Sequence, residues 1–135
     1  MMCAQILDSV LDRGNRVITQ IDMGRLGEPL QVSHALTCSS ESTCYVLKDT
    51  VHGRIYIGQC GRQVRVRHNE HVRAIVNKST KSPVAKYFNE KGLSKEHFWM
   101  CPAVKVVGGE FVRKAVESTL IEKYNTTILG LNTNH

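Results

Sequence analysis

Two short apolar segments joined by a turn constrain the fold more than any other part of the chain. Residues 44–47 read Cys-Tyr-Val-Leu, an aromatic and β-branched run of the kind that forms a buried strand. Residues 49–53 end in Gly53, which tolerates the positive φ of a tight turn. Residues 54–58, Arg-Ile-Tyr-Ile-Gly, supply a return strand. We therefore predict an antiparallel hairpin, followed by a basic helix that begins near Arg62.

The segments after the hairpin alternate between helical and extended patterns. Helical spacing predicts a first helix over residues 62–77, with Val64, Val72 and Ile75 facing inward. Ser82 before Pro83 predicts the start of a second helix that ends near Gly92. Residues 97–107 predict a third strand, and residues 110–124 a last helix. The order ββααβα indicates one α/β (α+β) domain over residues 43–135, with a small antiparallel sheet flanked by helices.

Two of these later elements carry more specific predictions. Pro102 interrupts the third strand, so we expect an edge position or a bulge there. The last helix is expected to bury a broad apolar face. Its members are Phe111, Val112, Ala115, Val116, Leu120 and Ile121. Residues 125–135 show no periodic pattern and are expected to be irregular.

Residues 1–42 form an N-terminal extension to this domain. Paired apolar residues predict a helix over 1–13, and partial alternation predicts strands over 16–21 and 30–36 that could form a hairpin. An added hairpin, a dimer surface and a DNA-contacting arm all remain open for this segment.

The charge of the chain favours an anionic partner. Its 135 residues carry a net charge of +6 and a sequence pI near 9.2. The basic side chains of the first core helix are opposed there only by Glu70. They are Arg62, Arg65, Arg67, Arg73 and Lys78. A basic stripe of this kind suits phosphate binding, although an ordinary solvated helix face gives the same pattern.

Other features bear on the location of the protein. No apolar run approaches the roughly 18 residues of a membrane span, and no secretory signal is evident at the start. The five cysteines are odd in number and lack the C-x-x-C spacing of a metal site. We therefore expect free thiols, and an intracellular (cytoplasmic or nuclear) protein that is not secreted.

Five features in order resemble the GIY-YIG nuclease superfamily. Tyr56-Ile57-Gly58 matches the second half of the name motif, and Tyr45 stands eleven residues before Tyr56, a spacing typical of the family. The first half is altered, because Thr43 and Cys44 replace its glycine and isoleucine. The remaining features match the family's helical arginine and histidine, its metal-binding glutamate and its closing G-x-N. They are Arg67 and His71, Glu117 in E-x-x-x-I, and Asn132 in Gly130-Leu131-Asn132.

The resemblance implies a divalent-metal-dependent DNA endonuclease with catalytic Tyr45, Tyr56, Arg67, His71 and Glu117. Glu117 would bind Mg²⁺ or Mn²⁺, a role that one carboxylate can fill when water and phosphate complete the shell. Arg67 would grip the scissile phosphate. Tyr45 would activate the water, Tyr56 would position water or phosphate, and His71 would orient a tyrosine or relay a proton.

Secondary roles at the same site are expected for five residues. Arg62 and Arg65 are candidate phosphate contacts, and Lys48 is placed where it could reach the same pocket. Gly58 would allow close approach of the substrate, and Asn132 would fasten the C-terminal tail through hydrogen bonds. His68, by contrast, is expected at the surface.

The expected partner is double-stranded DNA, with no membrane. The pattern after the hairpin is similar to homing-type and retroelement-associated members, and a small phage or restriction enzyme is equally compatible. A homo-oligomer is also compatible, because a compact nuclease that cuts both strands often uses two active sites. Two alternatives remain: a nucleic-acid-binding module that keeps the fold but has little catalytic activity, and a basic interaction domain in which Tyr45, Tyr56, Arg67 and Glu117 do not converge.

Overall fold

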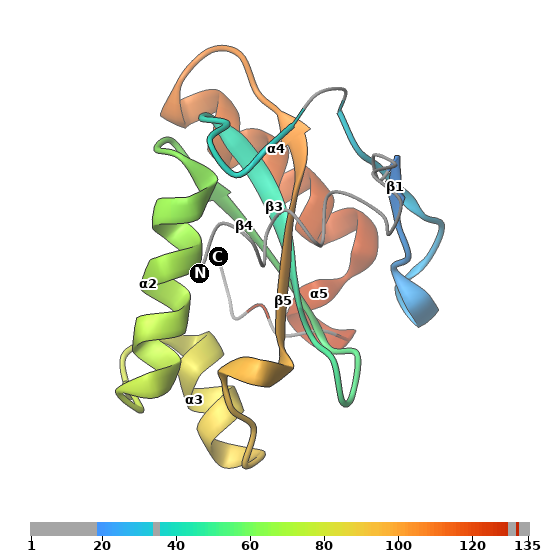
Figure 1. Cartoon of the computed structure of the whole chain (residues 1–135). Helices are drawn as coiled ribbons and strands as arrows, with labels where there is room; N and C mark the ends of the chain where they lie inside the picture. The colour runs from blue at the N-terminus through green and yellow to red at the C-terminus, as the bar shows by residue number, and fades with distance from the viewer. Residues whose placement is uncertain (1–18, 34–35, 130–131, 133–135) are drawn as a thin grey trace.

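A three-stranded antiparallel sheet forms the centre of the protein. The computed structural model describes residues 19–33, 36–129 and 132 (Figure 1). The sheet has the order β4-β3-β5. Its strands are β3 (Thr43–Asp49), β4 (Ile55–Cys60) and β5 (Phe98–Lys105). The α+β class and the antiparallel sheet predicted from the sequence are confirmed.

Helices cover both faces of the sheet. Figure 1 shows α2 (Val64–Val76) and α3 (Pro83–Glu90) on one side and α4 (Glu110–Tyr124) on the other. The Ser82 hydroxyl accepts a hydrogen bond from the Ala85 amide at 3.1 Å, and Pro83 opens α3, so the predicted helix start is confirmed. The short helix α5 (Thr126–Leu129) follows α4, so the irregular segment predicted there is wrong at these four residues.

The strand register decides which side chains share a face. Tyr45 pairs with Gly58, and Leu47 pairs with Tyr56. Paired residues of neighbouring strands point to the same side, and successive residues alternate. Tyr45, Tyr56 and Gly58 therefore lie on the face that α2 covers. Pro102 pairs with Tyr45 on the edge strand β5, and the register shifts between Cys44 and Tyr45, which confirms the predicted edge and bulge.

The N-terminal extension covers the outer edge of β5. Its strands β1 (Gln20–Ile21) and β2 (Leu30–Gln31) form a small antiparallel hairpin, and residues 16–18, 34 and 35 of the predicted strands lie outside the described residues. The Ser33 amide donates to the Ala103 carbonyl at 2.7 Å, and the Lys105 amide donates to the Ser33 hydroxyl at 3.0 Å. These bonds satisfy the edge beside the bulge. The helix predicted over residues 1–13 lies outside the described residues.

The inward face of α4 differs from the apolar face predicted for it. Phe111 is 86% exposed, whereas Ile121 and Tyr124 are buried. The helix is rotated so that Arg113 and Glu117, which share one side with Ile121, lie toward the sheet. Polar contacts with β4 therefore take positions that the apolar residues would otherwise occupy.

The cysteines agree only in part with the expectation of free thiols. Cys44, Cys60 and Cys101 are free and buried. Cys38 is disulfide-bonded, so the prediction is wrong at this position. Among the residues described, no helix is both long and apolar enough to cross a membrane.

Candidate functional site

Two tyrosines and a histidine form an aromatic cluster between β3, β4 and α2. The Tyr45 hydroxyl lies 2.8 Å from His71 Nε2. The ring centroids of Tyr45 and Tyr56 are 6.4 Å apart, and His71 lies 5.8 Å and 5.9 Å from them, edge-on to both. Residues from two strands and a helix thus bring their polar tips together. We call Tyr45, Tyr56 and His71 the tyrosine cluster.

Gly58 makes room for this arrangement. The Tyr45 ring crosses the neighbouring strand directly over Gly58, where a Cβ atom would lie 2.4 Å from both the hydroxyl oxygen and Cζ of Tyr45. Tyr45 is only 1% exposed, so its ring has no free space to move into. The glycine of the Tyr-Ile-Gly motif is therefore required by the packing of the other tyrosine.

Burial keeps the tyrosine cluster uncharged near neutral pH. It lowers the pKa of His71 to about 4, with a further contribution from the positive charge of Arg67. Burial also raises the pKa of Tyr45 well above its ordinary value, and Arg67 opposes this shift. The pKa of Tyr56 is raised by burial and then by Glu117. A neutral imidazole can accept the phenolic proton of Tyr45, provided that the ring carries its own proton on Nδ1.

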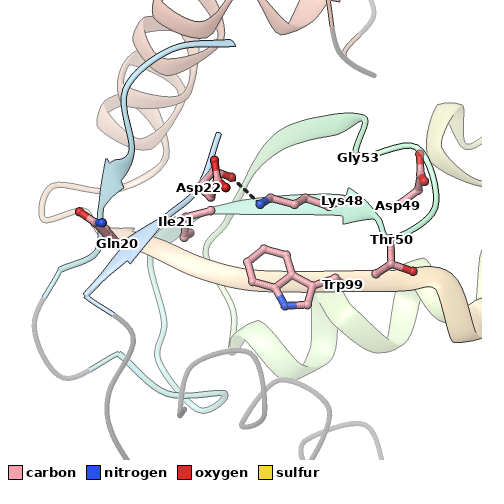
Figure 2. Close-up of a pocket in the computed structure, with 8 residues that line it drawn as sticks. All are labelled: Gln20, Ile21, Asp22, Lys48, Asp49, Thr50, Gly53 and Trp99. Carbon is pink, nitrogen blue, oxygen red and sulfur yellow. Dashed lines mark hydrogen bonds between the residues drawn. The ribbon is translucent and has the colours of Figure 1, made fainter. Parts of the chain in front are cut away.

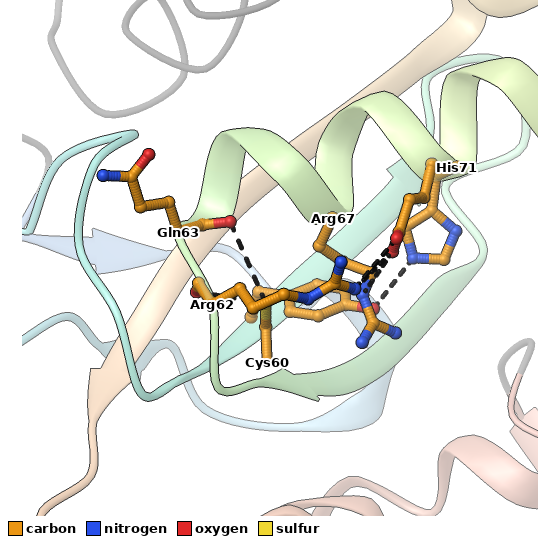
Figure 3. Close-up of polar contacts among 7 residues, drawn as sticks. Cys60, Arg62, Gln63, Arg67 and His71 are labelled. Carbon is orange, nitrogen blue, oxygen red and sulfur yellow. Dashed lines mark hydrogen bonds and ion pairs between the residues drawn. The ribbon is translucent and has the colours of Figure 1, made fainter.

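Arg67 lies beside the cluster and is held by Glu70. Burial opposes its charge, but Tyr45, Cys60 and Glu70 together raise the pKa of its guanidinium. Arg67 Nε lies 3.2 Å from Glu70 Oε1 without a hydrogen-bond alignment, so this contact is an ion pair. Arg62 donates to both oxygens of the same carboxylate, at 2.9 Å and 2.8 Å. Arg62, Arg67 and His71 are seen together in Figure 3.

Glu70 was not singled out as a site residue in the sequence. The sequence could have indicated its contact with Arg67, because residues three apart on one helix are neighbours on the helix surface. A carboxylate that bridges two guanidinium groups occupies the geometry that a phosphate would take. Arg65 lies apart from this group, exposed and bonded to Gln63 Oε1 at 2.6 Å.

Glu117 approaches the cluster from α4. It is partly buried, and its charge raises the pKa of Tyr56, Tyr45 and Cys44. Within the described residues, no group of three or more His, Cys, Asp or Glu side chains is arranged to hold a metal ion. The Glu117 carboxylate, whose charge acts on two tyrosines, is nevertheless a hard oxygen ligand of the kind that Mg²⁺ prefers, with water and phosphate left to complete the shell.

Asn132 connects the C-terminal tail to the outer edge of β4. Its Oδ1 accepts from the Ile57 amide at 2.8 Å, and its Nδ2 donates to the Ile57 carbonyl at 2.9 Å. This side chain replaces the neighbouring strand that β4 lacks on that side. It therefore fixes the strand between Tyr56 and Gly58.

Lys48 lies on the opposite face of the sheet, so its predicted reach to the same pocket is wrong. It is three residues from Tyr45, and alternation along a strand sends the two side chains to different faces. Lys48 donates to the Asp22 carbonyl and lies 5.0 Å from the centre of the Trp99 ring (Figure 2). Burial lowers its pKa. A cavity of about 530 Å³ opens beside these residues.

His68 is fully buried, so its predicted surface position is wrong. Its ring packs edge-on against Phe98 at 5.1 Å, and neither ring nitrogen has a hydrogen-bond partner among the residues described. Burial lowers its pKa to about 4. It lies one turn before His71 but does not reach Tyr45, since His71 occupies that position.

The comparisons with known proteins support the fold. No family model matches the sequence, and no curated protein matches it. Among solved structures, the catalytic domain of the homing endonuclease I-TevI is similar at 18% identity and a TM-score of 0.57, over 70% of this chain and 100% of that one. The catalytic domain of the intron endonuclease I-TevI, in a variant with a glutamate replaced by alanine, is similar at 19% identity and a TM-score of 0.60. The match covers 70% of this chain and 95% of that one. The chain thus shares the fold of these two catalytic domains over 70% of its length.

Proposed function

We propose that this chain is a divalent-metal-dependent endonuclease that hydrolyses phosphodiester bonds of double-stranded DNA. The observation that carries the proposal is the convergence of Tyr45, Tyr56, His71 and Arg67, with the Glu117 charge acting on the same tyrosines. Those side chains come from two strands and two helices. The solved structures that share the fold are described as endonuclease catalytic domains.

The tyrosine cluster provides a proton path. Tyr45 donates its hydroxyl proton to the neutral His71 Nε2 as its oxygen takes a proton from the attacking water. The water oxygen then bonds to phosphorus, and the bond from phosphorus to the leaving oxygen breaks. The neutral phenol is a weak base, whereas its phenolate is a strong one because the pKa of Tyr45 is raised. Transfer of the hydroxyl proton to His71 is therefore essential to this role.

Arg67 and Glu117 handle the negative charge. The planar guanidinium of Arg67 suits a two-point contact with the phosphoryl oxygens once Glu70 gives up its place. Glu117 would hold Mg²⁺ or Mn²⁺, which, when bound, neutralises phosphoryl charge and assists the leaving oxygen. Tyr56, whose pKa is raised by burial and then by the charge of Glu117, would position the water or the phosphate.

Nicking and linearisation of a supercoiled plasmid test the proposal. We expect cleavage with Mg²⁺ that disappears with EDTA and in Glu117→Ala, and that survives in Glu122→Ala, an exposed glutamate of the same helix. Cleavage by Glu117→Ala at the wild-type rate would contradict the assignment of the metal ligand. A high ratio of linear to nicked product would favour two active sites acting together in an oligomer.

One observation favours the alternative of a binding module with little catalytic activity. Tyr45 is 1% exposed, and Glu70 occupies the guanidinium groups that a phosphate would need. The same plasmid experiment decides between the two functions. DNA binding without cleavage in Mg²⁺ and Mn²⁺ would select the binding module.

A further inference from the structure

An exposed apolar cluster marks the turn between β5 and α4. Val107 is 85% exposed, Phe111 86% and Val112 36%. Gly108 and Gly109 adopt positive φ values of 128° and 92°, which glycine allows, and they turn the chain sharply into α4. We call Val107, Phe111 and Val112 the apolar tip. Exposed apolar side chains gathered at one place mark contact surfaces more often than single ones do.

Basic side chains lie at the same end of the molecule as the apolar tip. Arg113 lies against the segment that leads into α2, since a Cβ atom on Gly61 would come within 2.7 Å of its Nη2. Arg113 Nη1 also donates to the Ser42 hydroxyl at 3.3 Å. Further basic side chains of the same end are exposed. They are Arg62, Arg65, Lys105 and Lys114.

Acidic groups compensate these cations only in part. Glu110 pairs with Lys114 at 3.6 Å, and Glu70 pairs with Arg62. Lys105 donates to the backbone carbonyl of Glu41 at 2.5 Å, which leaves its charge in place. The apolar tip is thus set in a surface that favours a polyanion over an apolar protein face.

Arg113, which follows Val112 on α4, and Arg62, which precedes α2, both make contacts that lead toward the tyrosine cluster. Arg113 Nε donates at 3.0 Å to Gln59, the residue next to Gly58. Arg62 shares Glu70 with Arg67. Figure 1 places the β5–α4 turn at the same end of the molecule as the start of α2. A duplex bound at Arg67 would therefore extend over this end.

We propose that Phe111 inserts as a wedge between base pairs of the DNA held at the tyrosine cluster, while the surrounding cations contact its phosphates. This inference rests on the proposed function. Aromatic side chains used in this way unstack one step and bend the duplex. Positive charge close to the scissile phosphate holds the backbone on either side of the wedge. A second copy of the chain would meet like charges around the same apolar groups.

The test compares Phe111→Ser with Val76→Ser. Val76 is 57% exposed at the far end of α2, so its substitution removes a similar exposed apolar group away from the apolar tip. Both changes are made in Glu117→Ala, which keeps the DNA uncut. We expect Phe111→Ser to weaken binding to a mixed-sequence duplex by about tenfold at fixed salt. Val76→Ser should stay within about twofold.

A second readout separates a wedge from simple charge attraction. Closed circular plasmid is relaxed by a topoisomerase in the presence of each protein, and the change in linking number is measured. Insertion between base pairs unwinds the duplex, so the parent protein should change the linking number and Phe111→Ser should not. Melting temperatures equal to that of the parent would show that both variants remain folded.

Each outcome decides the inference independently of the nuclease proposal. Equal affinity and equal linking change for Phe111→Ser overturn the wedge, even if the wild-type protein cuts DNA. A Phe111-dependent linking change together with a wild-type protein that does not cut DNA in Mg²⁺ or Mn²⁺ supports the wedge and overturns the nuclease. Loss of self-association in Phe111→Ser with unchanged DNA binding would assign the apolar tip to a dimer interface and overturn the wedge.

Discussion

The two faces of the sheet differ in how their polar groups are placed. On one face, Tyr45, Tyr56 and His71 meet within a packed layer beneath α2, with Arg67 beside them. On the other face, Lys48 and Trp99 border a cavity of about 530 Å³. Lys48 is already bonded to the Asp22 carbonyl. The cavity and the tyrosine cluster thus lie on opposite faces of the same sheet.

Under the proposed function, the chemistry takes place on the packed face of the sheet and not beside the cavity. A reaction needs several polar groups held at bonding distance, and close packing is what holds them. The tyrosine cluster has such a contact between Tyr45 and His71, whereas beside the cavity the Lys48 ammonium donates to the backbone carbonyl of Asp22. Predictions that distinguish the two faces therefore test the assignment of the site.

The largest expected contrast is between Arg67→Ala and Lys48→Ala. Removing Arg67 deletes the charge that stabilises the phosphoryl group, so plasmid cleavage should slow by about 10³-fold. Lys48→Ala should change the rate by less than about threefold, because its side chain lies on the other face. Single-turnover cleavage rates at saturating DNA measure both. A loss in Lys48→Ala as large as that in Arg67→Ala would place the chemistry at the cavity beside Lys48 and Trp99.

Gly58→Ala is expected to have the next largest effect. The added Cβ would meet the Tyr45 ring at 2.4 Å, and the ring must move off its bond to His71. We expect a loss of about 10²-fold in cleavage rate, with about 1–3 kcal/mol of stability lost to overpacking. Tyr45→Phe in the same background provides the control, since both changes break one contact and their effects should not add. Additive effects in the four proteins would show that Gly58 acts elsewhere.

The sequence alone was sufficient to predict the hairpin and the three helices of the core. Local rules govern these features: Ser82 and Pro83 begin a helix, and a tyrosine at each strand follows from motif spacing. The wrong face for Lys48 could have been avoided, because alternation from Tyr45 already separates the two.

Acid should destabilise the face that holds the tyrosine cluster. Burial lowers the pKa of His68 and His71 to about 4 in the folded protein, from an ordinary value near 6.5. The unfolded chain therefore binds these protons first, so stability is complete above about pH 6.5 and is lost as the pH falls toward 4. Each histidine could contribute about 2 kcal/mol at most after allowance for partial hydration of the site.

Urea unfolding from pH 7 to pH 4.5 measures this effect. His68→Leu removes a buried imidazole that has no hydrogen-bond partner among the described residues, so it should reduce the slope of stability against pH while cleavage continues. His71→Leu should reduce the slope as well but abolish most cleavage, because Tyr45 loses its proton acceptor. An unchanged slope in both variants would mean that the histidines do not govern acid stability.

Three features lay beyond sequence patterns because they depend on tertiary packing. His68 is buried since α2 presses it against Phe98 of a strand thirty residues away, and Phe111 is exposed since α4 directs Arg113 and Glu117 toward β4 instead. In the sequence, Glu70 is only one acidic residue within a segment rich in basic residues. Only the fold shows that it holds two of those bases at once.

The smallest expected effect concerns Glu70, whose carboxylate binds both Arg62 and Arg67. Glu70→Gln removes the charge that competes with phosphate for Arg62 and Arg67, so the protein should bind duplex DNA about threefold to fivefold more tightly. The gain is small because these partly exposed ion pairs are each worth up to about 1 kcal/mol. Glu122→Gln makes the same change of charge on α4 and is the matched control. A gain in affinity of equal size in both variants would mean that the change in net charge alone explains it. A gain confined to Glu70→Gln would show that the Glu70 carboxylate occupies the place of a DNA phosphate.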